Sequence, residues 1–141
     1  MPSRDVLIVD DTWDCLLVLR LMLQRHGFSV RAAQSADEAL AEIESRTPDV
    51  LMLDVMMPGM SGLQLLERLR ANPATSGIPV IVVSARIGDD DVMAGYQVGA
   101  DYYITKPCTA QQVVRGIALV LGEDEATFVV SAAEETDPPV S

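Results

Sequence analysis

The sequence is poor in cysteine, histidine and aromatic side chains. Its 141 residues include two cysteines, one histidine and one tryptophan, and aromatic residues make up 4% of the chain. Cys15 and Cys108 stand far apart and neither belongs to a CxxC or a cysteine–histidine spacing. The sequence therefore predicts neither a zinc site nor a disulfide framework.

Basic residues are also scarce, since 10 Lys and Arg stand against 21 Asp and Glu, for a net charge of −11. Such a surface repels polyanions, so we expect no binding of nucleic acid or of anionic membranes by this chain. No apolar run approaches the roughly 20 residues of a membrane span. The N-terminus lacks a signal-peptide pattern. These absences favour a soluble, cytoplasmic protein.

The composition predicts one folded domain followed by an acidic tail. Hydrophobic residues make up 49% of the chain, and its length suits a single core. Residues 122–141 contain six acids, no base and two adjacent prolines. We therefore expect a domain over residues 1–121 and a disordered tail or linker over 122–141. A short apolar run in this tail, residues 128–130, could dock on the body of the protein.

Short aliphatic runs alternate with stretches of helical spacing. Strands are predicted at 6–9, 29–33, 50–53, 80–83 and 101–104, and helices at 14–26, 36–44, 63–71, 90–98 and 110–121. Three of the strand runs are purely aliphatic, which is typical of parallel strands buried on both faces. Ser35 and Glu38 fit a capping box at a helix start. This pattern predicts an α/β fold with a doubly wound, five-stranded parallel sheet and helices on both faces.

Polar residues follow the predicted strands at the edge where such folds bind ligands. Asp10 and Asp11 follow the first strand, Asp54 the third and Ser84 the fourth, while Lys106 stands just beyond the fifth. Three carboxylates, a hydroxyl and an ammonium group are thus expected to converge at one edge of the sheet.

Three neighbouring carboxylates repel one another unless a cation lies between them. Magnesium prefers oxygen ligands and commonly binds one or two protein carboxylates together with water. We expect Asp11 and Asp54 to bind Mg²⁺ directly and Asp10 to bind it mostly through water. The backbone carbonyl of Met56 is a further candidate ligand.

An aspartate carboxylate can attack a phosphoryl group and form an aspartyl phosphate. The transferring group spreads negative charge over three oxygens, so its site needs cations and hydrogen-bond donors. Lys106 is the only lysine of the chain and offers a compact positive charge for one of these oxygens. Ser84 offers a hydroxyl. Asp54 is the candidate phosphoacceptor.

The motifs at these positions closely resemble those of response-regulator receiver domains. They are Asp10-Asp11, the segment LDVMMPGMSG at 53–62, Ser84-Ala85, and GADYYITKP at 99–107. The resemblance covers about residues 5–121. It implies a flavodoxin-like fold with strand order 2-1-3-4-5, magnesium dependence, and phosphorylation of Asp54 by a histidine kinase or histidine phosphotransfer protein. It also implies a cis peptide bond between Lys106 and Pro107.

The resemblance further implies how a signal leaves the site. Ser84 and Tyr103 would form a switch pair, and the surface of helix four, strand five and helix five would contact a downstream protein or a second copy of the chain. Cys108 departs from the family pattern, which often has Phe there. Met56 and Arg86 occupy positions that tend to tune hydrolysis. We hypothesise that Arg86 gives a long-lived aspartyl phosphate, which a half-life of seconds would reject.

Simpler interpretations exist for individual residues. Asp10 and Asp11 could merely cap the following helix, and Asp54 could be an ordinary turn residue. Tyr103 would by default be a half-buried strand residue. Trp13 could be a packed aromatic, although its position after the acidic pair makes it a reporter of metal binding.

Other functions remain open at this point. A phosphohydrolase with an aspartyl nucleophile usually has a second Asp two residues later, where this chain has Met56. A docking module without phosphorylation would have no use for mutually repelling carboxylates. The chain could also be the N-terminal receiver fragment of a larger regulator with an output domain. For a receiver, which we favour, we expect a signalling domain rather than an enzyme that converts an external metabolite.

Overall fold

The computed structural model describes residues 4–54, 62–85 and 97–123. Five parallel strands form one sheet in the order β2-β1-β3-β4-β5. The strands are β1 (Asp5–Val9), β2 (Ser29–Ala33), β3 (Val50–Leu53), β4 (Val80–Ser84) and β5 (Tyr102–Thr105). The helices are α1 (Trp13–Arg25), α2 (Ala36–Ser45), α3 (Gly62–Ala71) and α5 (Ala110–Leu121). The predicted fold class and strand order are confirmed.

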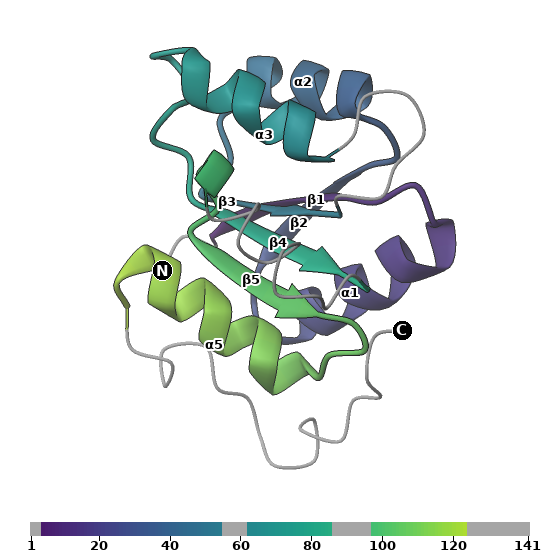
Figure 1. Ribbon diagram of the computed structural model, residues 1–141. Coiled ribbons are helices and arrows are strands. Elements are labelled where there is room, and N and C mark those ends of the chain that lie inside the picture. Colours follow the sequence, from purple (N-terminus) through teal and green to yellow (C-terminus); the bar gives the residue numbers. More distant parts are fainter. Residues whose placement is uncertain (1–3, 55–61, 86–96, 124–141) are drawn as a thin grey trace.

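The sheet lies between two layers of helices, with α2 and α3 on one face and α1 and α5 on the other (Figure 1). Leu7 and Val9 of β1 pack into the core on the α2 and α3 side, and Val6 and Ile8 pack into the core on the α1 and α5 side. Both faces of the strand are therefore apolar, which explains why its sequence lacks the alternation of a half-exposed strand.

Side chains of the sequence define the helix starts. The Ser35 hydroxyl accepts a hydrogen bond from the backbone N–H of Glu38 at 3.1 Å, as predicted. The return contact differs, because the Glu38 carboxylate accepts from the backbone N–H of Gln34. A full capping box, formed by Thr109 and Gln112, opens α5 and was not predicted.

The predicted boundaries hold to within one residue wherever the structure describes them. Ser84 is the last residue of β4 rather than the residue after it, and β5 begins and ends one residue later than predicted. His26 lies at the C-cap of α1, where a helix end was expected. The predicted helix over 90–98 falls mostly outside the described residues, within which 97 and 98 are helical.

Arg70 ties the end of α3 to the beginnings of β4 and β5. Its guanidinium donates to the carbonyls of Gly99 (3.0 and 2.8 Å), Ile78 (2.7 Å) and Ser76 (3.0 Å), and pairs with Asp101 at 3.0 Å. Gly99 has φ +121°, and a Cβ there would lie 2.9 Å from Arg70 Cγ. The glycine thus permits both the backbone turn and the close approach of the arginine.

Candidate functional site

The carboxyl ends of β1 and β3 bring the predicted acidic residues together. One carboxylate oxygen from each of three residues, Asp10, Asp11 and Asp54, lies within 4.8 Å of the other two. The backbone N–H of Asp10 donates to Ala33, and that of Asp54 donates to Val9. These bonds continue the strand ladders and fix both aspartates at the sheet edge. Asp10 and Asp54 are buried, whereas Asp11 is exposed.

Lys106 reaches this cluster from just beyond β5. Its Nζ donates to Asp10 Oδ2 at 2.7 Å and to Asp54 Oδ2 at 3.3 Å. Its backbone N–H donates to the carbonyl of Ser84, which fixes the lysine beside the end of β4. Burial lowers the pKa of Lys106, but its hydrogen bond to Asp10 and the charges of Asp54 and Asp10 outweigh this effect, so the pKa is raised overall. The ammonium group is therefore charged at neutral pH.

One ammonium group faces three carboxylates, so this cluster retains an excess of two negative charges. Oxygen donors with this excess charge fit a hard divalent cation, and the exposure of Asp11 leaves a side on which water can complete its coordination. The three aspartates are therefore able to hold Mg²⁺. Met56, whose carbonyl was predicted as a further ligand, lies outside the described residues.

The predicted switch residues stand on the two strands beside this cluster. Ser84 is fully buried at the end of β4, next to Thr105 in the strand register. Tyr103 is half-buried on β5 and packs against the core on the α2 and α3 side. The structure thus places Ser84 beside Lys106 and Tyr103 further back along β5. Arg86 lies outside the described residues.

The sequence predicts no metal site and no disulfide for the two cysteines, which leaves them as small hydrophobic residues, and both lie near Lys106. Cys108 fits that interpretation, because it is fully buried and burial raises the pKa of its thiol to about 11. Burial also raises the pKa of Cys15, while a hydrogen bond with Lys106 opposes that effect. No sequence motif links Cys15 to Lys106, so this contact could not be predicted.

The simpler interpretations can be tested against the same geometry. Asp10 Oδ1 accepts from the backbone N–H of Thr12 at 2.9 Å, so Asp10 does stabilise the start of α1 as well as bind Lys106. The side chain of Trp13 is 57% exposed, so its interpretation as a packed aromatic was wrong. The cis peptide bond between Lys106 and Pro107 is present, as predicted.

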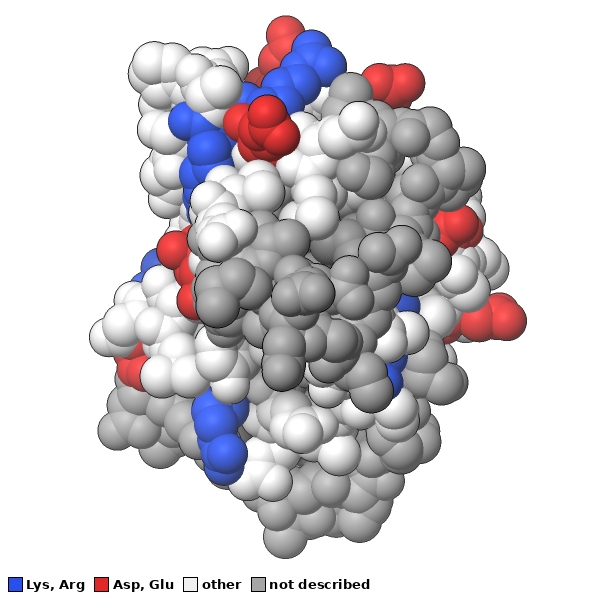
Figure 2. All heavy atoms as spheres, viewed as in Figure 1, with Lys and Arg blue, Asp and Glu red and all other residues white. Residues whose placement is uncertain are grey.

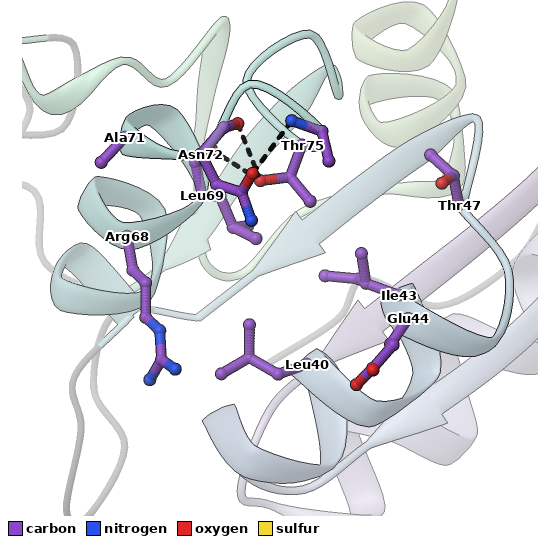
Figure 3. A pocket seen from close by; sticks show the side chains of 10 residues that line it. Leu40, Ile43, Glu44, Thr47, Arg68, Leu69, Ala71, Asn72 and Thr75 are labelled. Atoms are coloured by element: carbon purple, nitrogen blue, oxygen red, sulfur yellow. Dashed lines mark hydrogen bonds between the residues drawn. The ribbon is translucent and has the colours of Figure 1, made fainter.

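A separate cavity of about 660 Å³ lies between the C-terminal parts of α2 and α3. Leu40 and Ile43 of α2 and Leu69 of α3 contribute apolar side chains, and Glu44 and Arg68 contribute charged ones (Figure 3). None of the predicted site residues lines this cavity.

On the face of the molecule in Figure 2, acidic and basic side chains of the described residues are interspersed. Within those residues, no helix is long and apolar enough to cross a membrane.

Comparison with known proteins identifies relatives of the whole folded body. The family described as "Response regulator receiver domain" matches residues 6–118. The chain is 36% identical over 135 residues to the phosphate regulon transcriptional regulatory protein PhoB of Pseudomonas aeruginosa. It is 38% identical over 135 residues to the sensory transduction protein RegX3 of Mycobacterium tuberculosis. These alignments cover 92% and 94% of this chain but 59% and 58% of the relatives.

Solved structures agree with this relationship. A response regulator from Chloroflexus aurantiacus is 34% identical, with a TM-score of 0.83, and the match covers 86% of this chain and all of that one. The chemotaxis protein CheY4 of Vibrio cholerae is 27% identical, with a TM-score of 0.80, over 85% of this chain and all of that one.

Proposed function

Because the chain belongs to the response-regulator receiver family of two-component signalling, we propose that it accepts a phosphoryl group on Asp54 from a histidine kinase or a histidine phosphotransfer protein. The observation that carries this proposal is the cluster at the sheet edge, where Lys106 bridges Asp10 and Asp54 at 2.7 and 3.3 Å. Receivers of this family are signalling domains, and this chain is not proposed to convert an external metabolite.

Asp54 is the nucleophile in this proposal. One of its carboxylate oxygens bonds to phosphorus while the bond between phosphorus and the donor nitrogen breaks, and the electron pair of that bond returns to the imidazole of the donor. The backbone N–H of Asp54 donates to Val9 at 2.9 Å, which holds the attacking residue at the end of a buried strand. Hydrolysis by water would later regenerate the carboxylate.

Lys106 neutralises part of the charge that this reaction brings into the cluster. Its ammonium group is shared by Asp10 and Asp54 before the reaction, and we propose that it also binds an oxygen of the phosphoryl group afterwards. The raised pKa keeps the lysine protonated throughout. The hydroxyl of Ser84 is the proposed partner of a second phosphoryl oxygen.

Asp10, Asp11 and Asp54 are the proposed Mg²⁺ ligands, together with the backbone carbonyl of Met56. When bound, the cation would neutralise developing negative charge on the phosphoryl oxygens. The two carboxylate oxygens of Asp10 already accept hydrogen bonds from Lys106 Nζ and from the backbone N–H of Thr12. This occupancy supports the assignment of Asp10 as a ligand that acts mostly through water.

The proposed output is a change of protein contacts. Phosphorylation adds charge and acceptor oxygens beside Ser84, and a shift of Ser84 and Tyr103 would carry the change to the surface of helix four, β5 and α5. A downstream protein or a second copy of the chain would bind there. The predicted helix four lies mostly outside the described residues. The cytoplasmic location and the influence of Arg86 on phosphate lifetime stay predictions.

The chain spans just under three fifths of the length of PhoB and RegX3. The effect that phosphorylation has on a downstream target therefore depends on whether an output domain is attached. We propose either a single-domain receiver, with residues 1–121 folded and 122–141 as a tail, or the receiver part of a larger regulator with an output domain. A phosphohydrolase is disfavoured because Met56 stands where the second aspartate of such enzymes would act.

The proposal is tested by incubating the protein with Mg²⁺ and a small-molecule phosphodonor and measuring its intact mass. We expect the wild type to gain one phosphate, and Asp54→Asn to gain none because it lacks the nucleophilic carboxylate. Asp37→Asn, which changes an exposed acid on α2, is the control and should react like the wild type. Equal labelling of the Asp54 variant would refute the choice of acceptor.

A further inference from the structure

An exposed apolar stripe runs along α1. Trp13, Leu17 and Leu21 are 57%, 45% and 53% exposed, and their spacing of four residues places them on one side of the helix. The buried residues of α1 face the sheet from the other side. Among the large hydrophobic residues that the structure describes, only Leu119 is comparably exposed. These three side chains are therefore not part of the hydrophobic core.

The C-terminal tail leaves the body beside one end of this stripe. Glu123, the last described residue, forms an ion pair with Arg4. The carbonyl of Arg4 accepts from the backbone N–H of Ser29, directly after the turn that closes α1. Helices α1 and α5 also cover the same face of the sheet (Figure 1). The tail therefore starts near the C-terminal end of α1.

We propose that residues 128–130 of the tail, Phe-Val-Val, dock on Leu17 and Leu21 of α1. The five residues from Glu123 to Phe128 span at most about 17 Å when extended. Along α1, Leu21 and Leu17 lie about 6 and 12 Å from the last helical residue, Arg25. The tail is thus long enough to bring its one apolar run onto the leucines.

Charge favours the same placement. The part of α1 from residue 15 onward contains Arg20 and Arg25 and no acid, whereas the tail contains six acids and no base. Asp124 and Glu125 would lie near these arginines. Asp14, at the other end of the helix, would repel the tail and keep it on the C-terminal half. Because residues 124–127 form a short tether, the effective concentration of the apolar run at α1 is of the order of millimolar. A small apolar contact is then sufficient to keep the run docked.

The consequence for signalling rests on the proposed function. The stripe begins two residues after Asp11, at the end of α1 nearest the cluster, and the docked tail would cover the next part of the stripe, at Leu17 and Leu21. A protein donor large enough to cover α1 while it reaches the cluster would meet the docked tail, whereas a small phosphodonor would not. The docked tail would therefore slow phosphorylation by a protein donor and leave phosphorylation by a small molecule unchanged.

The docking itself is tested on the full chain without Mg²⁺ or phosphodonor, so its outcome does not depend on the proposed function. Amide resonances of ¹⁵N-labelled wild type would be compared with those of a variant carrying Phe128→Ser, Val129→Ser and Val130→Ser. We expect shifts at Leu17, Leu21 and their neighbours on α1. Val140→Ser, which changes an apolar residue elsewhere in the tail, is the matched control and should leave α1 unshifted.

A second arm alters the helix instead of the tail. In a Leu17→Ser and Leu21→Ser variant whose core resonances match the wild type, the three tail substitutions should cause no further shift on α1. Unshifted α1 resonances in the tail variant, or shifts confined to the cavity between α2 and α3, would overturn the proposal. Shifts that vanish on dilution would overturn it too, because they would identify a second copy of the chain as the occupant.

The regulatory consequence is measured separately, with a phosphorylated histidine phosphotransfer protein and with a small-molecule phosphodonor. The tail variant should react faster than the wild type with the protein donor and equally fast with the small molecule. Loss of reaction with both donors in the wild type would refute the proposed function and leave the docking result standing. Equal rates of wild type and variant with the protein donor would refute the regulatory role.

Discussion

The two edges of the sheet use aspartate in opposite ways. At the edge where the strands begin, the Asp5 carboxylate is paired with Arg31 at 2.7 Å and with Arg46 at 3.4 Å. At the edge where the strands end, Asp10 and Asp54 share the ammonium group of Lys106, and Asp11 is the third carboxylate of the same cluster. The charge of Asp5 at the first edge is balanced within the chain, whereas the cluster at the second edge has more carboxylates than ammonium groups. The difference separates an acid that holds the fold together from acids available for chemistry.

The largest effect is expected at the balanced edge. Replacing Asp5 with Ala leaves the mostly buried Arg31 without its nearer carboxylate partner, while Glu42 remains at 3.2 Å, so the free energy of unfolding should fall by about 3 kcal/mol. Urea denaturation measures this loss. Glu67→Ala, at an exposed position of α3, is the control and should change the free energy by less than about 0.5 kcal/mol. A similarly small loss of free energy for Asp5→Ala would show that Asp5 does not hold the fold together, and would contradict the contrast between the two edges.

Alkaline pH should lower the stability of the protein by ionising Cys108, which lies at the edge where the strands end. Burial raises the pKa of Cys108 from 9.0 to about 11, so the unfolded chain loses this proton at lower pH than the folded one. The contribution of the protonated Cys108 thiol to the free energy of unfolding is therefore fully present below pH 9. It is lost as the pH rises to 11, which lowers the free energy of unfolding by up to about 2 kcal/mol. Urea denaturation across this range should show a flatter decline for Cys108→Ala, even though this variant starts from a lower stability. An unchanged slope would contradict the assignment.

Magnesium should reverse the order of stability of the wild type and Asp11→Asn. Without the cation, Asp11→Asn relieves repulsion among the three carboxylates and should be as stable as the wild type or more stable by up to about 1 kcal/mol. At a free Mg²⁺ concentration ten times Kd, the wild type should gain about 1.4 kcal/mol. The variant should gain less. Thermal unfolding with Mg²⁺, against NaCl of equal ionic strength, measures the reversal; equal gains would place the cation elsewhere.

The smallest effect is optical. Trp13 is the only tryptophan and stands two residues after Asp11, so binding of Mg²⁺ should change its fluorescence. Asp11→Asn should show a weaker response at the same concentration, whereas Glu67→Ala should respond like the wild type. An unchanged spectrum of the wild type at saturating Mg²⁺ would argue against the proposed position of the cation.

The sequence was sufficient to predict that three separate segments meet at one edge of the sheet. Aliphatic runs located the central strands, and the rule that parallel strands end at a common edge joined Asp10, Asp54 and Lys106 across the chain. The helix boundaries followed from Ser35 and from the turn at His26 and Gly27. In each case the signal is local in the sequence, or depends only on topology.

The balanced edge could not be predicted in the same way. The pairing of Asp5 with Arg31 depends on the register between β1 and β2 and on side-chain conformations, and neither is encoded in a short motif. The contact between Cys15 and Lys106 was missed for a similar reason, because a lone cysteine at a helix start has no signature. The exposure of Trp13 was also unforeseen, since an aromatic residue gives no sign of which side of a helix it occupies.

The arrangement of Arg70 and Gly99 constrains how this chain can diverge. Any side chain at position 99 would be strained and would collide with the arginine, while loss of the arginine would leave the carbonyls of Gly99 and Ile78 without this donor. Neither position can change freely alone. In a library of functional variants, position 99 should therefore remain glycine even where residue 70 has changed, because the positive φ disfavours any side chain there.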